Sequence, residues 1–166
     1  MIFIIKIFIV SLLGLLFGFI LAIRTYPRRE VNKIYRSFKK ENNKEGEWVH
    51  FREKIDYNFR LIVKPNCETL YSSTFINLCD HNYKLVVPKL SDYFSITFIN
   101  FQTEVLGYIT NKDLNIDQQT EFIISKDKYN CNLCWIIVRY GLTNDNFNEI
   151  HDLQNNISLV KLNDEY

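Results

Sequence analysis

The sequence predicts a mainly β (α+β) protein carried on an N-terminal transmembrane helix, and three observations support this prediction. The first 23 residues are apolar apart from Lys6. The remaining 143 residues are 41% apolar and rich in Phe, Tyr, Ile, Val and Leu, side chains that suit the pleated, half-buried surface of a sheet. Short apolar runs then alternate with turn residues, often about every ten residues, which indicates an antiparallel sandwich or a barrel-like sheet.

Residues 1–23 form the predicted transmembrane anchor. A helix of this length rises about 34 Å, which is enough to cross a hydrocarbon core of about 30 Å. A cleaved signal peptide is the alternative, but Ala22 is the only alanine and no A-x-A pattern precedes Arg24. Gly14 and Gly18 form a G-x-x-x-G step, which would let two such helices approach closely and predicts a weak homodimer contact.

Residues 24–47 form a predicted basic juxtamembrane segment and linker. The collar from Arg24 to Lys44 has a net charge of +6, whereas residues 45–166 have a net charge of −6. We expect the lipid bilayer as a partner, because each cation near anionic headgroups contributes about 1 kcal/mol. The acidic remainder argues against nucleic acid, which requires a basic face. The expected membrane-surface residues are Arg24, Arg28, Arg29, Lys33, Arg36, Lys39 and Lys40.

Apolar residues recur with helical spacing after Pro27. They fall at i, i+3, i+4 and i+7 and are Val31, Ile34, Tyr35 and Phe38. This stripe predicts an amphipathic helix from about Arg28 to Lys40, with the collar cations on its outer face. The polar stretch Glu41–Glu47 surrounds Gly46 and predicts a linker.

Residues 48–166 form the predicted β-rich domain. A C-terminal helix is expected within it, with Asn144 as its cap and Phe147, Ile150, Leu153 and Ile157 on its buried side. The last strand-like run before that helix is apolar on both faces and predicts a central strand. The strand-like runs are Leu61–Val63, Leu70–Leu78, Leu85–Val87, Tyr93–Ile99, Val105–Ile109, Phe122–Ile124 and Leu133–Val138.

The four cysteines and three histidines form no recognisable metal or catalytic motif. Cys131 and Cys134 have C-x-x-C spacing, but Cys67 and Cys79 do not form the second pair that a tetrahedral metal site requires. If Cys131 lies on the same strand as Cys134, the two thiols are beyond disulfide reach. There is also no G-x-S-x-G motif and no P-loop. We therefore expect structural thiols, with a disulfide or a metal site as alternatives, and neither a cofactor nor a catalytic residue.

The candidate ligand-binding residues are Asn66, Glu68, Thr69, Tyr71 and Arg139. Asn66 belongs to a predicted turn, and alternation along the following strand puts Thr69 and Tyr71 on one face. Hydroxyls beside the Glu68 carboxylate would line a polar pocket, to which Arg139 at a strand end would add a cation. In the alternative interpretation Tyr71 packs in the core and Arg139 is a solvated strand end.

The segment from Pro65 to Ser72 resembles a bacterial domain of unknown function, numbered 1254, whose members carry a P-N-x-D-T-L-Y-S motif. Four further segments follow in the order of that family, namely Leu85–Pro88, Asp92–Thr103, Trp135–Arg139 and Ile150–Gln154. The resemblance covers about Val49 to Leu162. Three charged family positions lose or reverse their charge, because Asn77 and Asn100 replace Asp and Asp92 replaces Arg, and Glu68 also stands in place of Asp.

The resemblance implies export and pairing with a second β-rich domain, numbered 1214, which we expect here as a separate polypeptide. The positive-inside rule points the other way, because the basic collar outweighs Lys6 and the amino terminus and so favours a cytoplasmic domain. The chain is therefore expected in the cell membrane as a single-pass protein with its orientation open.

The leading functional hypothesis is non-catalytic binding of a partner protein or a small ligand. One alternative is a structural subunit completed by a separate partner domain. The other is a hydrolase or isomerase in which Glu68 acts as general base and Tyr71 as donor, which would require burial to raise the pKa of Glu68.

Overall fold

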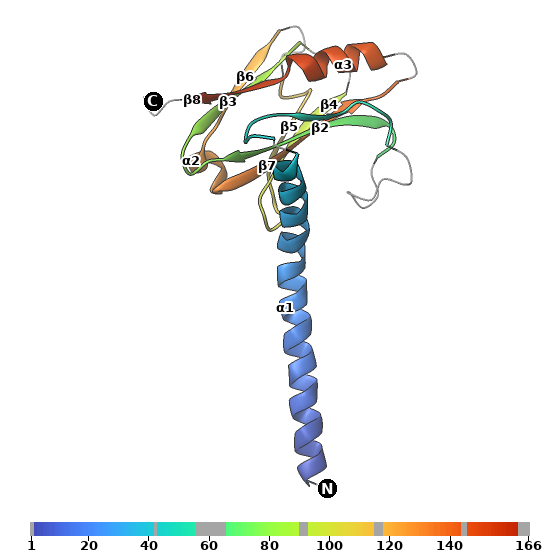
Figure 1. Cartoon of the computed structure of the whole chain (residues 1–166), viewed down its shortest axis with the longest axis vertical. Helices are drawn as coiled ribbons and strands as arrows, with labels where there is room; N and C mark the ends of the chain where they lie inside the picture. Colours follow the sequence, from blue (N-terminus) through green and yellow to red (C-terminus); the bar gives the residue numbers. More distant parts are fainter. Residues whose placement is uncertain are drawn as a thin grey trace.

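The computed structural model describes residues 2–41, 43–55, 66–89, 93–114, 118–143 and 146–162. Figure 1 shows one long helix, α1 (Ile2–Lys40), whose C-terminal end meets a β-rich domain and whose N-terminal part projects away from it. The sequence predicted a separate helix after Pro27, but Pro27 lies inside α1. A proline removes one intrahelical hydrogen bond without always ending the helix. The anchor and the amphipathic segment are therefore one continuous rod.

The projecting part of α1 is long and apolar enough to cross a membrane. Its most apolar 18-residue window has a mean hydropathy of 2.7, and none of that window is buried. All side chains from Phe3 to Arg24 are exposed. Such an exposed apolar surface is typical of a segment in contact with lipid.

The described residues of the domain form two antiparallel sheets and two short helices, α2 (Lys126–Tyr129) and α3 (Phe147–Asn156). One sheet has the order β1-β2-β7-β4-β5, with the strands Val49–Phe51, Thr69–Asn77, Leu133–Gly141, Phe94–Ile99 and Val105–Thr110. The other has the order β6-β3-β8, with the strands Thr120–Ile124, Asn82–Val87 and Ser158–Leu162. The described strands form two open antiparallel sheets and not a closed barrel, so of the two predicted arrangements the sandwich is confirmed.

The five-stranded sheet is apolar on both faces. Alternation along β2 and β7 turns Leu70 and Ile136 toward the core shared with the second sheet. The opposite face presents Phe75, Trp135 and Ile137, against which α1 packs. The helix residues in this second core are Val31 and Phe38, with Ile34 and Tyr35 partly buried beside them. The predicted amphipathic stripe is therefore the surface that attaches α1 to the sheet.

The segment after α1, which the sequence predicted as a linker, contacts both α1 and the five-stranded sheet. The Tyr35 hydroxyl donates a hydrogen bond to Glu45 Oε1 at 2.9 Å, and Lys39 Nζ lies 3.1 Å from the same oxygen. The backbone N–H of Gly46 donates to the Phe75 carbonyl at 2.8 Å. These contacts fix the angle at which α1 meets the domain.

The strand predictions are confirmed to within a few residues, with one correction that affects the site. β7 ends at Gly141 and not at Val138, because β2 pairs with it as far as Thr69↔Gly141. The sequence analysis did not predict β1, β8 or α2. The predicted strand Leu61–Val63 and the predicted cap Asn144 lie outside the described residues.

Helix α3 packs through Ile150 and, at its C-terminal end, Ile157, as predicted. Its Gln154 is fully buried and was not predicted to be. The Gln154 amide donates to the carbonyls of Phe51 at 3.3 Å and Tyr71 at 3.0 Å. This side chain therefore holds α3 against the edge of the five-stranded sheet, beside the turn that enters β2.

Candidate functional site

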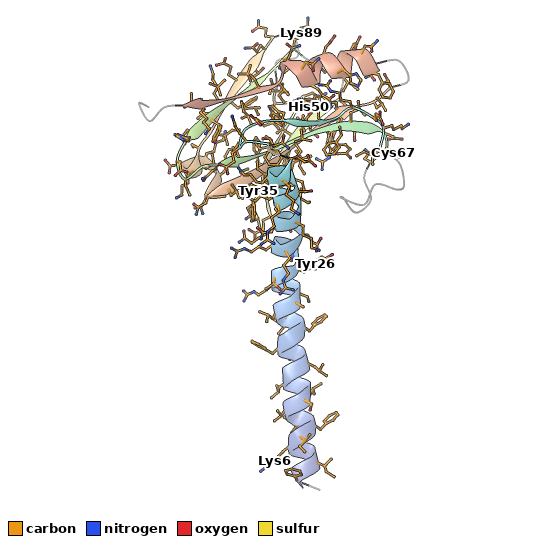
Figure 2. The ribbon with its side chains drawn as sticks, viewed as in Figure 1. Lys6, Tyr26, Tyr35, His50, Cys67 and Lys89 are labelled. Atoms are coloured by element: carbon orange, nitrogen blue, oxygen red, sulfur yellow. The ribbon has the colours of Figure 1, made fainter. Side chains whose placement is uncertain are left out.

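Four of the five predicted ligand-binding residues line one cleft of about 660 Å³. We call it the Arg139 cleft. It lies where the turn before β2 meets the end of β7, and Figure 2 labels Cys67 in that turn. Its lining residues are Lys54, Asn66, Glu68, Thr69, Tyr93, Arg139, Gly141, Leu142, Thr143 and Phe147.

The turn that supplies Asn66, Glu68 and Thr69 is held on both sides. Asn66 Oδ1 accepts a hydrogen bond from the Glu68 N–H at 2.9 Å, which closes an Asx turn. The Glu68 carbonyl accepts from the Leu142 N–H at 2.8 Å. The backbone of this turn is therefore tied to the chain that leaves β7, and Glu68 is directed outward with an exposed side chain.

Tyr71 stabilises the turn through a hydrogen bond from the core and does not line the cleft. Its side chain is 5% exposed, and its hydroxyl accepts a hydrogen bond from the Asn66 N–H at 3.0 Å. The ring contributes to the core between α1 and the sheet. Of the two interpretations of Tyr71, the structure matches the one in which it packs in the core.

Arg139 lies inside β7, half-buried, and is not a solvated strand end. It pairs with Tyr71 of β2 on one side and Ser95 of β4 on the other. Its guanidinium donates to Thr97 Oγ1 at 2.9 Å and lies 5.9 Å from the centroid of the Tyr71 ring. A guanidinium has five N–H donors in a planar fork. Arg139 is therefore a positioned cation with donors available to the cleft.

The charges around the cleft are two cations and one carboxylate. Lys54 and Glu68 are exposed, and Arg139 is half-buried. Among the described residues, none of these three groups is in an ion pair within 4.0 Å. The cleft therefore has an excess of positive charge at an otherwise acidic domain.

An aromatic and apolar wall completes the cleft. It consists of Tyr93, Leu142 and Phe147. The Tyr93 carbonyl accepts from the Gly141 N–H at 2.8 Å, and a Cβ at Gly141 would lie 2.8 Å from the Tyr93 Cβ. Gly141 therefore allows Tyr93 to lie directly against β7. Tyr93 belongs to a segment that resembles the family and Phe147 was predicted on the buried side of a helix, but neither these residues nor Lys54 were predicted to line the cleft.

The structure also brings together a histidine and a serine that the sequence did not connect. His50 Nδ1 lies 2.7 Å from Ser72 Oγ, and burial lowers the pKa of His50 to about 4. Ser72 is 0% exposed, so its hydroxyl is closed to a substrate. This pair is a structural contact of the core.

The described cysteines and acidic groups offer no metal centre. Within the described part of the chain, no group of three or more His, Cys, Asp and Glu side chains is placed to hold a metal ion. The four cysteines are free thiols. Cys131 precedes β7 instead of lying on it, so the strand-length argument against a disulfide does not apply. The neighbouring Cys134 side chain lowers the pKa of the Cys131 thiol below its ordinary value.

Comparison with known structures confirms the fold. The chain is similar to the VPA0106 protein from Vibrio parahaemolyticus, with a TM-score of 0.62 and 11% identity over 84% of this chain and 36% of that one. It is also similar to an uncharacterised protein from Burkholderia cenocepacia, with a TM-score of 0.44 and 14% identity over 61% of this chain and 31% of that one. The chain thus spans about a third of the length of each.

No curated protein matches the chain. A family model described as "Protein of unknown function (DUF1254)" matches residues 46–161. The match includes both sheets and every lining residue of the Arg139 cleft, in agreement with the resemblance found from the sequence motifs. The chain belongs to the DUF1254 family.

Proposed function

We propose that this protein is a single-pass, membrane-anchored binding module whose Arg139 cleft takes a small organic anion. The observation that carries the proposal is the convergence of Asn66, Glu68, Thr69 and Arg139, from two distant segments, on one cleft. The Arg139 side chain is half-buried and, among the described residues, is in no ion pair within 4.0 Å. The anchor is supported by the exposed apolar part of α1.

The lining favours an anion with an apolar body. Charged groups are in the minority, and Tyr93 and Phe147 contribute aromatic rings to the lining. A carboxylate can accept two parallel hydrogen bonds from one guanidinium, which fixes its orientation. Ligand pockets typically combine such an apolar wall with a few placed polar groups and have volumes of about 300–1,000 Å³.

The probe for this proposal is phenylacetate, which has one carboxylate and one ring. Binding to the full-length protein in detergent micelles is measured by isothermal titration calorimetry. The neutral phenylacetamide and the cationic benzylamine are titrated in parallel. We expect phenylacetate to bind and the other two to bind at least about tenfold more weakly, because a charge-assisted hydrogen bond contributes about 1.5–3 kcal/mol.

Two variants and a control assign the binding to the cleft. Arg139→Gln should weaken phenylacetate binding at least about tenfold, whereas Arg36→Gln, which removes an exposed α1 cation outside the cleft, should leave it unchanged. Glu68→Gln should tighten binding by about twofold to fivefold, because it removes a like charge from the rim. Preference for benzylamine, or full phenylacetate binding by Arg139→Gln, would contradict the proposal.

The enzymatic alternative makes a different demand on Glu68. A general base that acts near neutral pH needs a carboxylate whose pKa is raised by burial. The Glu68 side chain is exposed at the rim of the cleft, and this exposure supports binding over catalysis.

A further inference from the structure

A second cleft, of about 520 Å³, lies where α1 enters the domain. We call it the stalk cleft. Three separate segments form it: one side of α1, the turn between β4 and β5, and the connection from α2 to β7. Its lining residues are Arg28, Asn32, Tyr35, Asn100, Phe101, Gln102, Lys126, Asn130, Cys131, Asn132 and Leu133. Figure 2 labels Tyr35 at this level of the helix.

The position of the stalk cleft along α1 places it beside the headgroups of a bilayer, if α1 is the anchor of the proposed function. The predicted membrane-spanning segment ends at Ile23, and Arg28 follows five positions later, or about 7.5 Å further along the helix. The polar headgroup layer of each leaflet is about 5–8 Å thick. Figure 1 shows the turn between β4 and β5 descending along α1 toward this level. Arg28, the lining residue of α1 nearest to the apolar segment, therefore lies at the level of the headgroups.

The lining of the stalk cleft is cationic and rich in amides. Arg28 and Lys126 are exposed, and neither is in an ion pair within 4.0 Å among the described residues. No carboxylate is among the lining residues, although Glu104 lies next to the cleft and accepts a hydrogen bond from Asn100 at 2.6 Å. The Asn32 amide donates to the Arg28 carbonyl at 2.8 Å, which leaves the amides of Gln102, Asn130 and Asn132 as the donors of the lining. Two cations and these amides match the oxygens of a phosphate group.

The backbone around the stalk cleft is fixed before any ligand binds. Asn100 Oδ1 accepts hydrogen bonds from the N–H groups of Gln102 and Glu104, both at 2.9 Å. Asn130 ends α2 in a left-handed conformation with φ 46°. The Asn132 carbonyl accepts from the Leu78 N–H at 2.7 Å. A preformed site loses little conformational entropy on binding.

We propose that the stalk cleft binds the phosphate headgroup of an anionic membrane lipid, whose acyl chains lie along the exposed apolar part of α1. This proposal rests on the anchor in the proposed function. It differs from the general attraction of the basic collar, because only Arg28 of the collar cations lines the cleft and because Lys126 lies nearly 100 residues away in the sequence.

Two matched double variants distinguish lipid binding in the stalk cleft from the general electrostatic attraction of the basic collar to anionic lipid. Arg28→Gln/Lys126→Gln removes both cations of the cleft. Arg29→Gln/Lys128→Gln removes two cations that lie one and two positions away in the sequence and do not line the cleft. All four side chains are exposed, so both double variants should fold, and the near-ultraviolet circular dichroism spectrum checks this. The two variants have equal net charge.

The experiment reconstitutes the full chain in phosphatidylcholine vesicles that contain a minor fraction of phosphatidylglycerol. Native mass spectrometry then measures which lipid stays bound to the protein after release. We expect wild type and Arg29→Gln/Lys128→Gln to retain phosphatidylglycerol about tenfold above its share of the vesicle, and Arg28→Gln/Lys126→Gln to retain it in proportion to its share. Equal retention by the two double variants would overturn the proposal.

Two further arms separate the possible causes of failure. Inorganic phosphate in excess should not displace the lipid, and displacement would show that the cleft takes free phosphate instead. An alkaline carbonate wash tests the anchor itself. A protein that resists the wash without enriching phosphatidylglycerol overturns the stalk-cleft proposal alone. A protein released by the wash overturns both the anchor and this proposal, whereas phenylacetate binding in the Arg139 cleft is scored separately.

Discussion

The two clefts lie at opposite ends of β7 and are built in different ways. Leu133, the first residue of β7, lines the stalk cleft, and Arg139 and Gly141, near its end, line the other. Between them Trp135 and Ile137 form the surface on which α1 packs. The docked helix therefore covers the middle of the sheet face and provides a wall for the stalk cleft alone.

The cations of the two clefts differ in how firmly they are held. Arg139 is half-buried in a central strand, bonded to Thr97 and stacked near Tyr71. Arg28 and Lys126 are exposed on separate helices. Salt screens exposed charges far more than partly buried ones. The comparison predicts a selective site at Arg139 and a salt-sensitive, headgroup-binding site at the stalk.

The largest effect is expected in the core between α1 and the five-stranded sheet, which lies between the two clefts. Phe75 is 1% exposed, stacks on Trp135 with centroids 5.6 Å apart, and contacts Tyr35 and Phe38 of α1 edge-on. Phe75→Ala should lower the free energy of unfolding by about 3–5 kcal/mol. Chemical denaturation of the full chain in micelles measures this change.

The control for Phe75→Ala is Tyr108→Ala, at a side chain that is 71% exposed. It should change the free energy of unfolding by about 0.5 kcal/mol or less. Similar losses in the two variants would mean that α1 does not pack on the sheet through Phe75.

Gly141→Ala should affect only the Arg139 cleft. The new Cβ would lie 2.8 Å from the Tyr93 Cβ, so Tyr93 must shift, at a cost of about 1–3 kcal/mol in the free energy of unfolding. Phenylacetate binding should weaken while phosphatidylglycerol retention stays unchanged. In the control Gly107→Ala, the nearest atom lies at 3.4 Å, near ordinary contact. Loss of lipid retention in Gly141→Ala would show that the two clefts are coupled.

A smaller effect is expected from acid, through His50 on the other face of the sheet. Burial lowers the pKa of His50 to about 4 from the ordinary 6.5. Below pH 6.5 the unfolded chain binds a proton that the folded chain does not. The contribution of His50 to the free energy of unfolding should therefore be constant above pH 6.5. It should fall by about 1–2 kcal/mol between pH 6.5 and 4, after allowance for partial exposure.

Denaturation of wild type and His50→Gln at pH 7, 5 and 4 checks this prediction. The variant should lack this part of the pH dependence. If the free energy of unfolding changed with pH equally in wild type and His50→Gln, the acid sensitivity would belong to other groups.

Most of the fold could be predicted because its signals are local. The alternation of Thr69–Asn77 and the helical stripe from Val31 to Phe38 each follow from backbone periodicity. What could not be predicted depends on tertiary context. The strand Val49–Phe51 is three residues long and is defined by its pairing with β2. Continuation of α1 through Pro27 and burial of Gln154 likewise depend on the packed sheet and helix around them.

The two clefts also differ in how far local sequence signals predict them. Four lining residues of the Arg139 cleft were candidates from the sequence because Asn66–Thr69 form a contiguous motif and Arg139 was predicted at the end of a strand. The stalk cleft was missed because its cations, Arg28 and Lys126, belong to segments that only the packing of α1 brings together. Arg28 was predicted at the membrane surface, but its partner on α2 carried no sequence signal.

The smallest predicted effect concerns Cys131, the thiol that lines the stalk cleft. Its lowered pKa gives more thiolate near neutral pH. In a Cys67→Ser/Cys79→Ser background, iodoacetamide should label Cys131 about twofold to fivefold more slowly in vesicles with phosphatidylglycerol than in pure phosphatidylcholine. Arg28→Gln/Lys126→Gln should abolish this difference in labelling rate. The difference is expected to be small because Cys131 is already half-buried.

The central claim is that one sheet face carries two independent anion sites. The most direct test measures both ligands on both variants, with phenylacetate titrated in micelles and phosphatidylglycerol retention measured from vesicles. Arg139→Gln should lose phenylacetate and keep the lipid, whereas Arg28→Gln/Lys126→Gln should lose the lipid enrichment and keep phenylacetate. Loss of both ligands in either variant, or of neither in both, would contradict the account.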